Sequence, residues 1–170
     1  RRRVGGCGAP PEVEILRLGE EGVFAARGTM RVGVSALELF QRLTDPVENL
    51  RIFSSNVVGL NFRNLLEEDR ERCTRLFEVS KTGRWRIIGI PLSFESTVYA
   101  EEDWSALEIR FRIKKPGAMK HFAGFWRLVP ISSSETLVVF YNEAMTNFPL
   151  PALFYKLCEP FVRAMCASLL

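Results

Sequence analysis

The sequence predicts an α+β domain in which one curved antiparallel sheet of about seven strands wraps around a long C-terminal helix. Three observations lead to this fold class. Between residues 57 and 145 the chain consists of short runs rich in β-branched and aromatic residues, with turn sequences between them at regular spacing. Two short helical patterns precede that series, directly after the first long strand. Only the helical pattern at residues 151–170 is long enough to cover the inner face of such a sheet.

The first part of the chain combines two strands with a pair of short helices. Residues 13–18 predict a short strand and residues 23–34 a long one. Ser35 is expected to be the N-cap of a first helix, because its hydroxyl can accept a hydrogen bond from the first helical turn. Asp45 and Pro46 predict a second helix, with Asp45 as N-cap and Pro46 at the first helical position. The two helices should form a V-shaped pair.

The rest of the chain predicts hairpin-linked strands followed by the terminal helix. The strands are expected at residues 57–66, 73–79, 85–90, 92–100, 107–113, 119–129 and 136–145. Turns are expected at the sequences EEDRE, KTGR, EEDW, KKPG and PISSSE. The carboxylates in two of these turns should be solvated and without a chemical role, namely Glu67, Glu68, Asp69, Glu101, Glu102 and Asp103. Pro160 should bend the terminal helix, because it lacks the backbone N–H that a helix needs there.

Composition excludes several classes of protein. The chain has 170 residues, 47% of them hydrophobic and 25% charged, and we expect a flexible segment at residues 1–12 and a single domain at residues 13–170. Lys and Arg number 23 and Asp and Glu 20, and Arg1, Arg2 and Arg3 account for the whole excess, so a nucleic-acid partner is not expected. No run of about 18 apolar residues predicts a transmembrane helix. The basic start is similar to the end of a transit peptide, which favours an organelle, chloroplast before mitochondrion.

Residues that carry enzyme chemistry are sparse. His121 is the single histidine, and no Ser-His-Asp, Cys-His, paired-carboxylate or phosphate-loop pattern accompanies it, so a histidine at the rim of the fold is favoured over a catalytic one. The cysteines Cys7, Cys73, Cys158 and Cys166 form no CxxC pair, and we expect free thiols rather than a metal site. The sequence therefore predicts no catalytic residue, no metal ligand and no required cofactor, and an enzyme is the less favoured class.

The order of elements resembles a known superfamily. Two blocks carry the likeness: FAARGTMRVGVSALELFQRLTDPVENLRIFSSNV near the start, and HFAGFWRLVPISSSETLVVFY before the proline-led terminal helix. They resemble the START-like superfamily, also called the polyketide cyclase/lipid-transport, SRPBCC or Bet v 1-like group, whose fold is the helix-grip fold. The Coq10-like and plastid cyclase/dehydrase-like branch is the most similar, with LTD between two helices and then G-x-W-x-L-x-P before a Thr-led strand. This chain has Gly124, Trp126, Leu128, Pro130 and Thr136 at those places.

The resemblance implies an apolar cavity between the concave sheet and the terminal helix, which would bind a lipid, quinone, isoprenoid or pigment. Strand alternation is consistent with it, because residues 107–113 and 122–128 each place large apolar side chains on one face. The expected cavity residues are Phe94, Val98, Leu107, Ile109, Phe111, Phe122, Trp126, Val138, Phe140, Asn142, Phe154, Leu157 and Phe161. The alternative is that the rings fill a core, since alternation shows burial and not vacancy. Asn142 should need a partner, either a ligand head group, a bound water or neighbouring backbone.

The last two strands are also apolar on the face that should point outward. The residues concerned are Phe125, Val129, Leu137, Val139, Tyr141 and Met145. Adjacent apolar side chains on an exposed face usually mark a partner or membrane surface. We expect that either a partner or the first strand or N-terminal segment covers them.

Three functions follow from the sequence. The favoured one is a lipid-binding protein that transports or presents a hydrophobic small molecule to a membrane process in a chloroplast, at the thylakoid, or in a mitochondrion. The second is a non-catalytic assembly or accessory subunit that docks on an organellar membrane complex through the outer face of the sheet. The third is a small enzyme of the cyclase/dehydratase kind, for which His121 is the one candidate acid or base.

Overall fold

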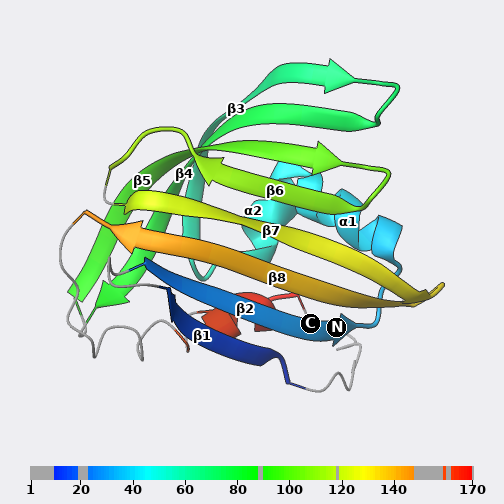
Figure 1. Ribbon diagram of the computed structural model, residues 1–170, viewed down its shortest axis with the longest axis horizontal. Helices are drawn as coiled ribbons and strands as arrows, with labels where there is room; N and C mark the ends of the chain where they lie inside the picture. Colours follow the sequence, from blue (N-terminus) through cyan, green and yellow to red (C-terminus); the bar gives the residue numbers. More distant parts are fainter. Residues whose placement is uncertain are drawn as a thin grey trace.

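The computed structural model describes residues 10–18, 23–87, 90–117, 119–147, 159 and 162–169. In this part of the chain, eight antiparallel strands form one curved, open sheet in the order β1-β2-β8-β7-β6-β5-β4-β3 (Figure 1). The strands are β1 (Glu12–Leu18), β2 (Val23–Val32), β3 (Val57–Asp69), β4 (Thr74–Ile87), β5 (Ile90–Asp103), β6 (Glu108–Ile113), β7 (Met119–Ser132) and β8 (Glu135–Thr146). The predicted α+β fold class is confirmed, with eight strands where about seven are expected from the sequence.

Two short helices, α1 (Ala36–Thr44) and α2 (Pro46–Ile52), connect β2 to β3 and lie on one side of the sheet (Figure 1). Both predicted N-caps are confirmed. The Ser35 hydroxyl accepts from the amide of Glu38 at 3.3 Å, and the Asp45 carboxylate accepts from the amides of Val47 and Glu48 at 2.9 Å. These bonds satisfy amides that a helix start otherwise leaves unpaired, so each helix begins where the sequence predicts.

The hairpin of β4 and β5 is longer than the sequence predicts. Residues 74–79 and 85–87, which are expected on two separate strands, belong to one strand, β4, which pairs with β5 along its whole length. KTGR therefore lies inside β4, and its prediction as a turn is wrong. The reason is that Gly83 supports packing here instead of a turn, because the ring of Phe94 occupies the space that a Cβ at Gly83 would need.

The acidic sequences EEDRE and EEDW also differ from the prediction. The six carboxylates expected in turns lie on strands: Glu67, Glu68 and Asp69 end β3, and Glu101, Glu102 and Asp103 end β5. Glu68 accepts from Arg75 at 2.8 Å, and buried Glu102 pairs with Arg63 at 2.6 Å. A cation on a neighbouring strand stabilises Glu68, and Arg63 on β3 stabilises Glu102, which the local sequence does not reveal. Asp69 and Asp103 instead accept from amides of the turns that follow them.

The core lies between the concave face of the sheet and the helices. Trp126 and Phe140 from the sheet are buried together with Phe40 and Leu43 from α1 and with Phe53 directly after α2. The sequence assigned the inner face to the terminal helix alone. In the structure the helix pair covers part of it as well.

Part of the predicted terminal helix is described. Residues 162–167 are helical, and Val162 and Cys166 join the core. The guanidinium of Arg163 donates to the carbonyl of Pro11 at 2.8 Å, which ties this C-terminal helical segment to the chain just before β1.

Several expectations concern residues outside the described ranges. They include the bend at Pro160 and, within the flexible segment expected at residues 1–12, residues 1–9. Within the ranges that are described, no helix has the length and hydropathy needed to cross a membrane.

Candidate functional site

A cavity of about 290 Å³ lies on the concave face of the sheet, walled by strands β3 to β8, the helix pair and the C-terminal helical segment. Seven of the residues expected from the sequence line it: Phe94, Val98, Ile109, Phe111, Phe122, Trp126 and Phe140. They come from four different strands, and alternation along each strand turns them to the same side. These seven residues thus belong to the part of the wall that β5 to β8 contribute, and their role in ligand binding stays a prediction.

The other expected cavity residues lie elsewhere. Val138 is fully buried in the core, and Leu107 packs against the core from the β5–β6 turn. Asn142 is on the inner face as expected and is 8% exposed, and its side-chain oxygen has no hydrogen-bond partner among the described residues. Phe154, Leu157 and Phe161 lie outside the described residues.

One part of the cavity wall is built from aromatic rings. The ring centroids of Trp126 and Phe140 are 4.3 Å apart, those of Phe111 and Phe122 are 5.0 Å apart, and Phe53 lies 5.8 Å from Trp126. Such tilted contacts are favourable arrangements for aromatic pairs. The rings present a large apolar surface toward the cavity.

Strands β7 and β8 of this wall approach each other closely where Gly124 lies opposite Asn142. A Cβ built at Gly124 would lie 2.1 Å from the carbonyl oxygen of Tyr141 and 2.7 Å from Cα of Asn142. These contacts are with backbone, which cannot move aside cheaply. Glycine at position 124 therefore allows the close approach of β8.

Polar residues from β3, β4 and β5 form another part of the wall, and the sequence did not predict them. They are Arg63, Lys81, Ser96 and Glu102 on the strands, with Asn49 on α2 and Asn56 after it. Lys81 belongs to KTGR and Glu102 to EEDW, both of which the sequence assigns to turns. The sequence does contain a signal for the inward position of Lys81. Phe77, Val79, Lys81 and Gly83 alternate with their neighbours, and this alternation continues through KTGR and places Lys81 on the inner face.

Arg63, which is half-buried, and Glu102 form an ion pair at 2.6 Å. Glu102 is 5% exposed, and its second carboxylate oxygen has no partner among the described residues. Burial raises the pKa of Glu102, while Arg63 opposes this rise. The pair brings one positive and one negative charge to the wall, so it is close to neutral as a unit.

The ammonium group of Lys81 has a neutral hydrogen-bond partner among the described residues. Its Nζ donates to the side-chain oxygen of Asn49 at 2.5 Å, and the Asn49 amide nitrogen donates to the carbonyl of Leu43 at 2.8 Å. Burial lowers the pKa of Lys81 to about 8, and the charge of Arg63 acts in the same direction. Among the described residues, no carboxylate lies within ion-pair distance of Lys81.

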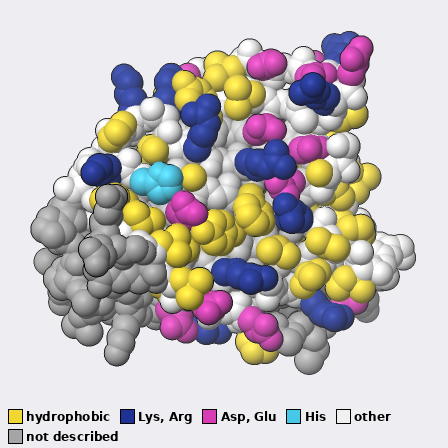
Figure 2. Space-filling view, viewed as in Figure 1, with side chains coloured by type: hydrophobic (Ala, Val, Ile, Leu, Met, Phe, Trp, Pro, Cys, Tyr) yellow, Lys and Arg dark blue, Asp and Glu magenta, His cyan; other side chains and the backbone are white. Residues whose placement is uncertain are grey.

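The outer face of the sheet holds the predicted apolar set, mixed with charged side chains (Figure 2). Val129 is 38% exposed, and the other members are half-buried: Phe125, Leu137, Val139, Tyr141 and Met145. The rings of Phe125 and Tyr141 are stacked at 5.8 Å, and the Arg127 guanidinium lies 5.1 Å from the centre of the Phe125 ring. The first strand does not cover this set, because β1 pairs with β2 and extends the sheet at its edge.

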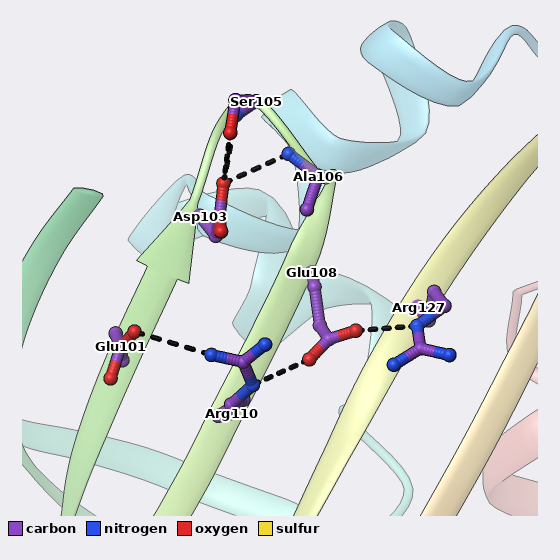
Figure 3. A network of polar contacts seen from close by, with 7 residues as sticks. All are labelled: Glu101, Asp103, Ser105, Ala106, Glu108, Arg110 and Arg127. Carbon is purple, nitrogen blue, oxygen red and sulfur yellow. Dashed lines mark hydrogen bonds and ion pairs between the residues drawn. The ribbon is translucent and has the colours of Figure 1, made fainter. Parts of the chain in front are cut away.

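A network of charges interrupts this outer face (Figure 3). Glu108 is 3% exposed and accepts from the Nε atoms of Arg110 and Arg127, at 2.5 Å in each case. Alternation predicts Glu108 on the outer face, and it lies there, but the two guanidinium groups bury it. Arg127 thus neutralises Glu108 and shields part of Phe125, which makes the outer face less apolar than its strand sequences suggest.

The candidate reactive residues lie apart from the cavity. His121 is on the outer face, with its Nε2 3.2 Å from Glu143, and Tyr141 donates to the other oxygen of Glu143 at 2.7 Å. Cys73 is exposed and Cys166 is buried, both as free thiols, and Cys7 and Cys158 lie outside the described residues. No group of three or more potential metal ligands occurs within the described ranges.

Comparison with solved structures identifies the class of fold as START-like, the helix-grip fold. The chain is similar to TTHA0849 from Thermus thermophilus with a TM-score of 0.63 and 17% identity, over 85% of this chain and 93% of that one. It is similar to the Zhui aromatase/cyclase from a Streptomyces species with a TM-score of 0.59 and 16% identity, over 86% and 92% of the two chains. A START superfamily protein from Mycobacterium smegmatis gives 0.58 and 14%, over 85% and 93%.

No protein-family model and no curated protein sequence matches the chain. The likeness to solved structures therefore establishes the helix-grip fold that the sequence predicts. The narrower resemblance to the Coq10-like branch stays a prediction.

Proposed function

We propose that this protein binds a hydrophobic small molecule, of the lipid, quinone, isoprenoid or pigment kind, in the cavity on the concave face of its sheet, and transports or presents it to a membrane process. The observation that carries this proposal is the ring-lined wall formed by Trp126, Phe140, Phe111 and Phe122. Small-molecule sites are typically apolar concavities with a few polar groups, and this cavity has that composition.

Two further observations support the proposal. The cavity volume of about 290 Å³ is near the lower end of the ~300–1,000 Å³ typical of ligand sites. Solved structures of the same fold include an aromatase/cyclase, so the fold accommodates small-molecule chemistry in that protein. His121, the one acid or base that the sequence offers as a catalytic candidate, does not line the cavity.

The test is binding of an uncharged probe to the purified protein. Dodecanol is titrated by calorimetry, and native mass spectrometry identifies molecules that co-purify. Val98→Trp should fill the cavity and abolish binding, because Val98 lines it. Thr97→Trp on the same strand faces the other side of the sheet and should bind as the wild type does. Equal binding by both variants would refute the cavity as the site.

A second candidate function is docking of an accessory subunit on an organellar membrane complex through the outer face. The stacked pair of Phe125 and Tyr141, with neighbouring Val139, supports it. Val139→Lys should then abolish self-association or complex formation without unfolding the domain. Unchanged sedimentation and co-purification of Val139→Lys would remove this candidate.

A further inference from the structure

The wall of the cavity is chemically two-sided. Its closely spaced rings come from β6 to β8 and from the end of α2, whereas its charged residues come from β3, β4 and β5, on the other half of the sheet. A molecule that occupies the cavity would therefore meet aromatic surface along one part and a mixture of charged, polar and aliphatic groups along the other. This arrangement suits an amphiphile better than a hydrocarbon.

The charges of the polar part leave an excess of one positive charge. Arg63 is compensated by Glu102 at 2.6 Å. Lys81 is bound to the neutral amide of Asn49, and no carboxylate of the described residues pairs with it. An isolated charge taken out of water is unfavourable unless an opposite charge or several hydrogen bonds compensate it.

The same wall contains a second donor, and this one is unsatisfied. The side-chain nitrogen of Asn56 is buried and has no hydrogen-bond partner among the described residues. Asn56 and Lys81 both line the cavity. Buried donors normally have partners, so two donors with unused capacity in one cavity indicate that an acceptor binds there.

We propose that the cavity takes a monoanionic amphiphile, an apolar body ending in one carboxylate, and that the ammonium of Lys81 binds this carboxylate. The inference rests on the proposed function and specifies its ligand class. A single negative charge matches the single uncompensated positive charge. A dianion such as a phosphate monoester would add a second negative charge beside Glu102 and be repelled.

The protonation state of Lys81 is compatible with this role. With a pKa of about 8, the amine is charged in about nine molecules in ten at pH 7. A bound carboxylate would favour the charged form and raise this pKa. The other charged groups of the surrounding wall are Arg63 on β3 and Glu102 on β5, and α2 contributes the neutral Asn49.

The test compares two probes of the same chain length, dodecanoate and dodecanol, by calorimetry at pH 7 below their micellar concentrations. Lys81→Met removes the charge while keeping an unbranched side chain. We expect it to weaken dodecanoate binding by about tenfold or more, the usual range for a hydrogen bond to a charged group, and to leave dodecanol within about twofold. Lys115→Met, in the exposed β6–β7 turn, is the matched control and should change neither.

The outcomes separate this inference from the proposed function. If wild-type protein binds both probes equally and Lys81→Met changes neither affinity, the cavity is a ligand site and Lys81 is not its anchor. If wild-type protein binds neither probe, both proposals fail. A pH series on the wild-type protein tests the inference without any variant. The affinity for dodecanoate should fall between pH 7 and pH 9.5, because Lys81 loses its charge in this range, and the affinity for dodecanol should not change. A flat dodecanoate profile would overturn the inference.

Discussion

Replacing Lys81 by Met should stabilise the folded protein at pH 7. Lys81 is half-buried in the cavity wall, and burial together with Arg63 lowers its pKa from the ordinary value of 10.5 to about 8. A difference of this size corresponds to about 3 kcal/mol of unfavourable free energy for the charged amine in the folded chain, since each pKa unit is worth about 1.4 kcal/mol. Loss of the hydrogen bond to Asn49 offsets about 1 kcal/mol of it. The expected gain in free energy of unfolding is therefore about 2 kcal/mol.

The pH dependence of this gain has a defined sign. Below about pH 8 the amine is charged in both the folded and the unfolded chain, so the wild type carries the whole penalty. Between about pH 8 and pH 10.5 the folded chain has released the proton and the unfolded chain retains it, so the stability of the wild type rises with pH. The advantage of Lys81→Met should accordingly fall below about 1 kcal/mol at pH 10.

Urea denaturation followed by circular dichroism at pH 7 and pH 10 measures both values. Lys115→Met, which removes an exposed lysine, should differ from the wild type by less than about 0.5 kcal/mol at either pH. If Lys81→Met were destabilising by the same amount at both pH values, the ammonium would not be desolvated in the way the cavity geometry requires. The reasoning from burial and charge would then be wrong.

Three other substitutions or reactions test the packing. Gly124→Ala should lower the free energy of unfolding, measured by urea titration, by ~3 kcal/mol or more, because its Cβ would lie 2.1 Å from the Tyr141 carbonyl oxygen. Gly33→Ala is the control and should be near neutral in the same titration, because the space around Gly33 is open. Trp126→Ala should cost about 3 kcal/mol, at the low end for a buried Trp, because one side of the ring already borders the cavity; a loss near ~5 kcal/mol would indicate a close-packed site instead. Burial raises the pKa of the Cys166 thiol to about 11, so at pH 8 iodoacetamide should alkylate exposed Cys73 well before Cys166, and peptide mass spectrometry showing equal rates would contradict the placement of Cys166 in the core.

The order of elements was predictable because its signals are local. The caps at Ser35 and Asp45 act within one helical turn, and both are confirmed. The residues on the inner and outer faces of β7 and β8 were also predictable, because side chains alternate along a strand with a fixed period. Trp126 and Phe140 are accordingly buried, and Val129 is partly exposed.

The contribution of the helix pair to the cavity was not predictable in this way. Phe53 contacts Trp126 with ring centroids 5.8 Å apart, although the two residues are far apart in the sequence. Their contact depends on how the V-shaped pair lies on the sheet, which no local pattern encodes. The burial of Glu108 beneath Arg110 and Arg127 is another case, because it depends on side chains from two neighbouring strands.

The errors of local prediction coincide with the polar part of the cavity. KTGR and EEDW have the composition of turns, yet they continue strands and supply Lys81 and Glu102 to the wall, and Arg63 lies on β3 between two register shifts. A charged residue at an inward strand position conflicts with the local preference for apolar residues there and lowers the stability of the fold. Such conflicts concentrate at functional sites. If that explains Lys81, then Lys81→Met must raise the free energy of unfolding and weaken dodecanoate binding in the same protein sample. A variant that lost both stability and affinity would show instead that Lys81 is part of the structural framework, and the conflict at KTGR would have no functional meaning.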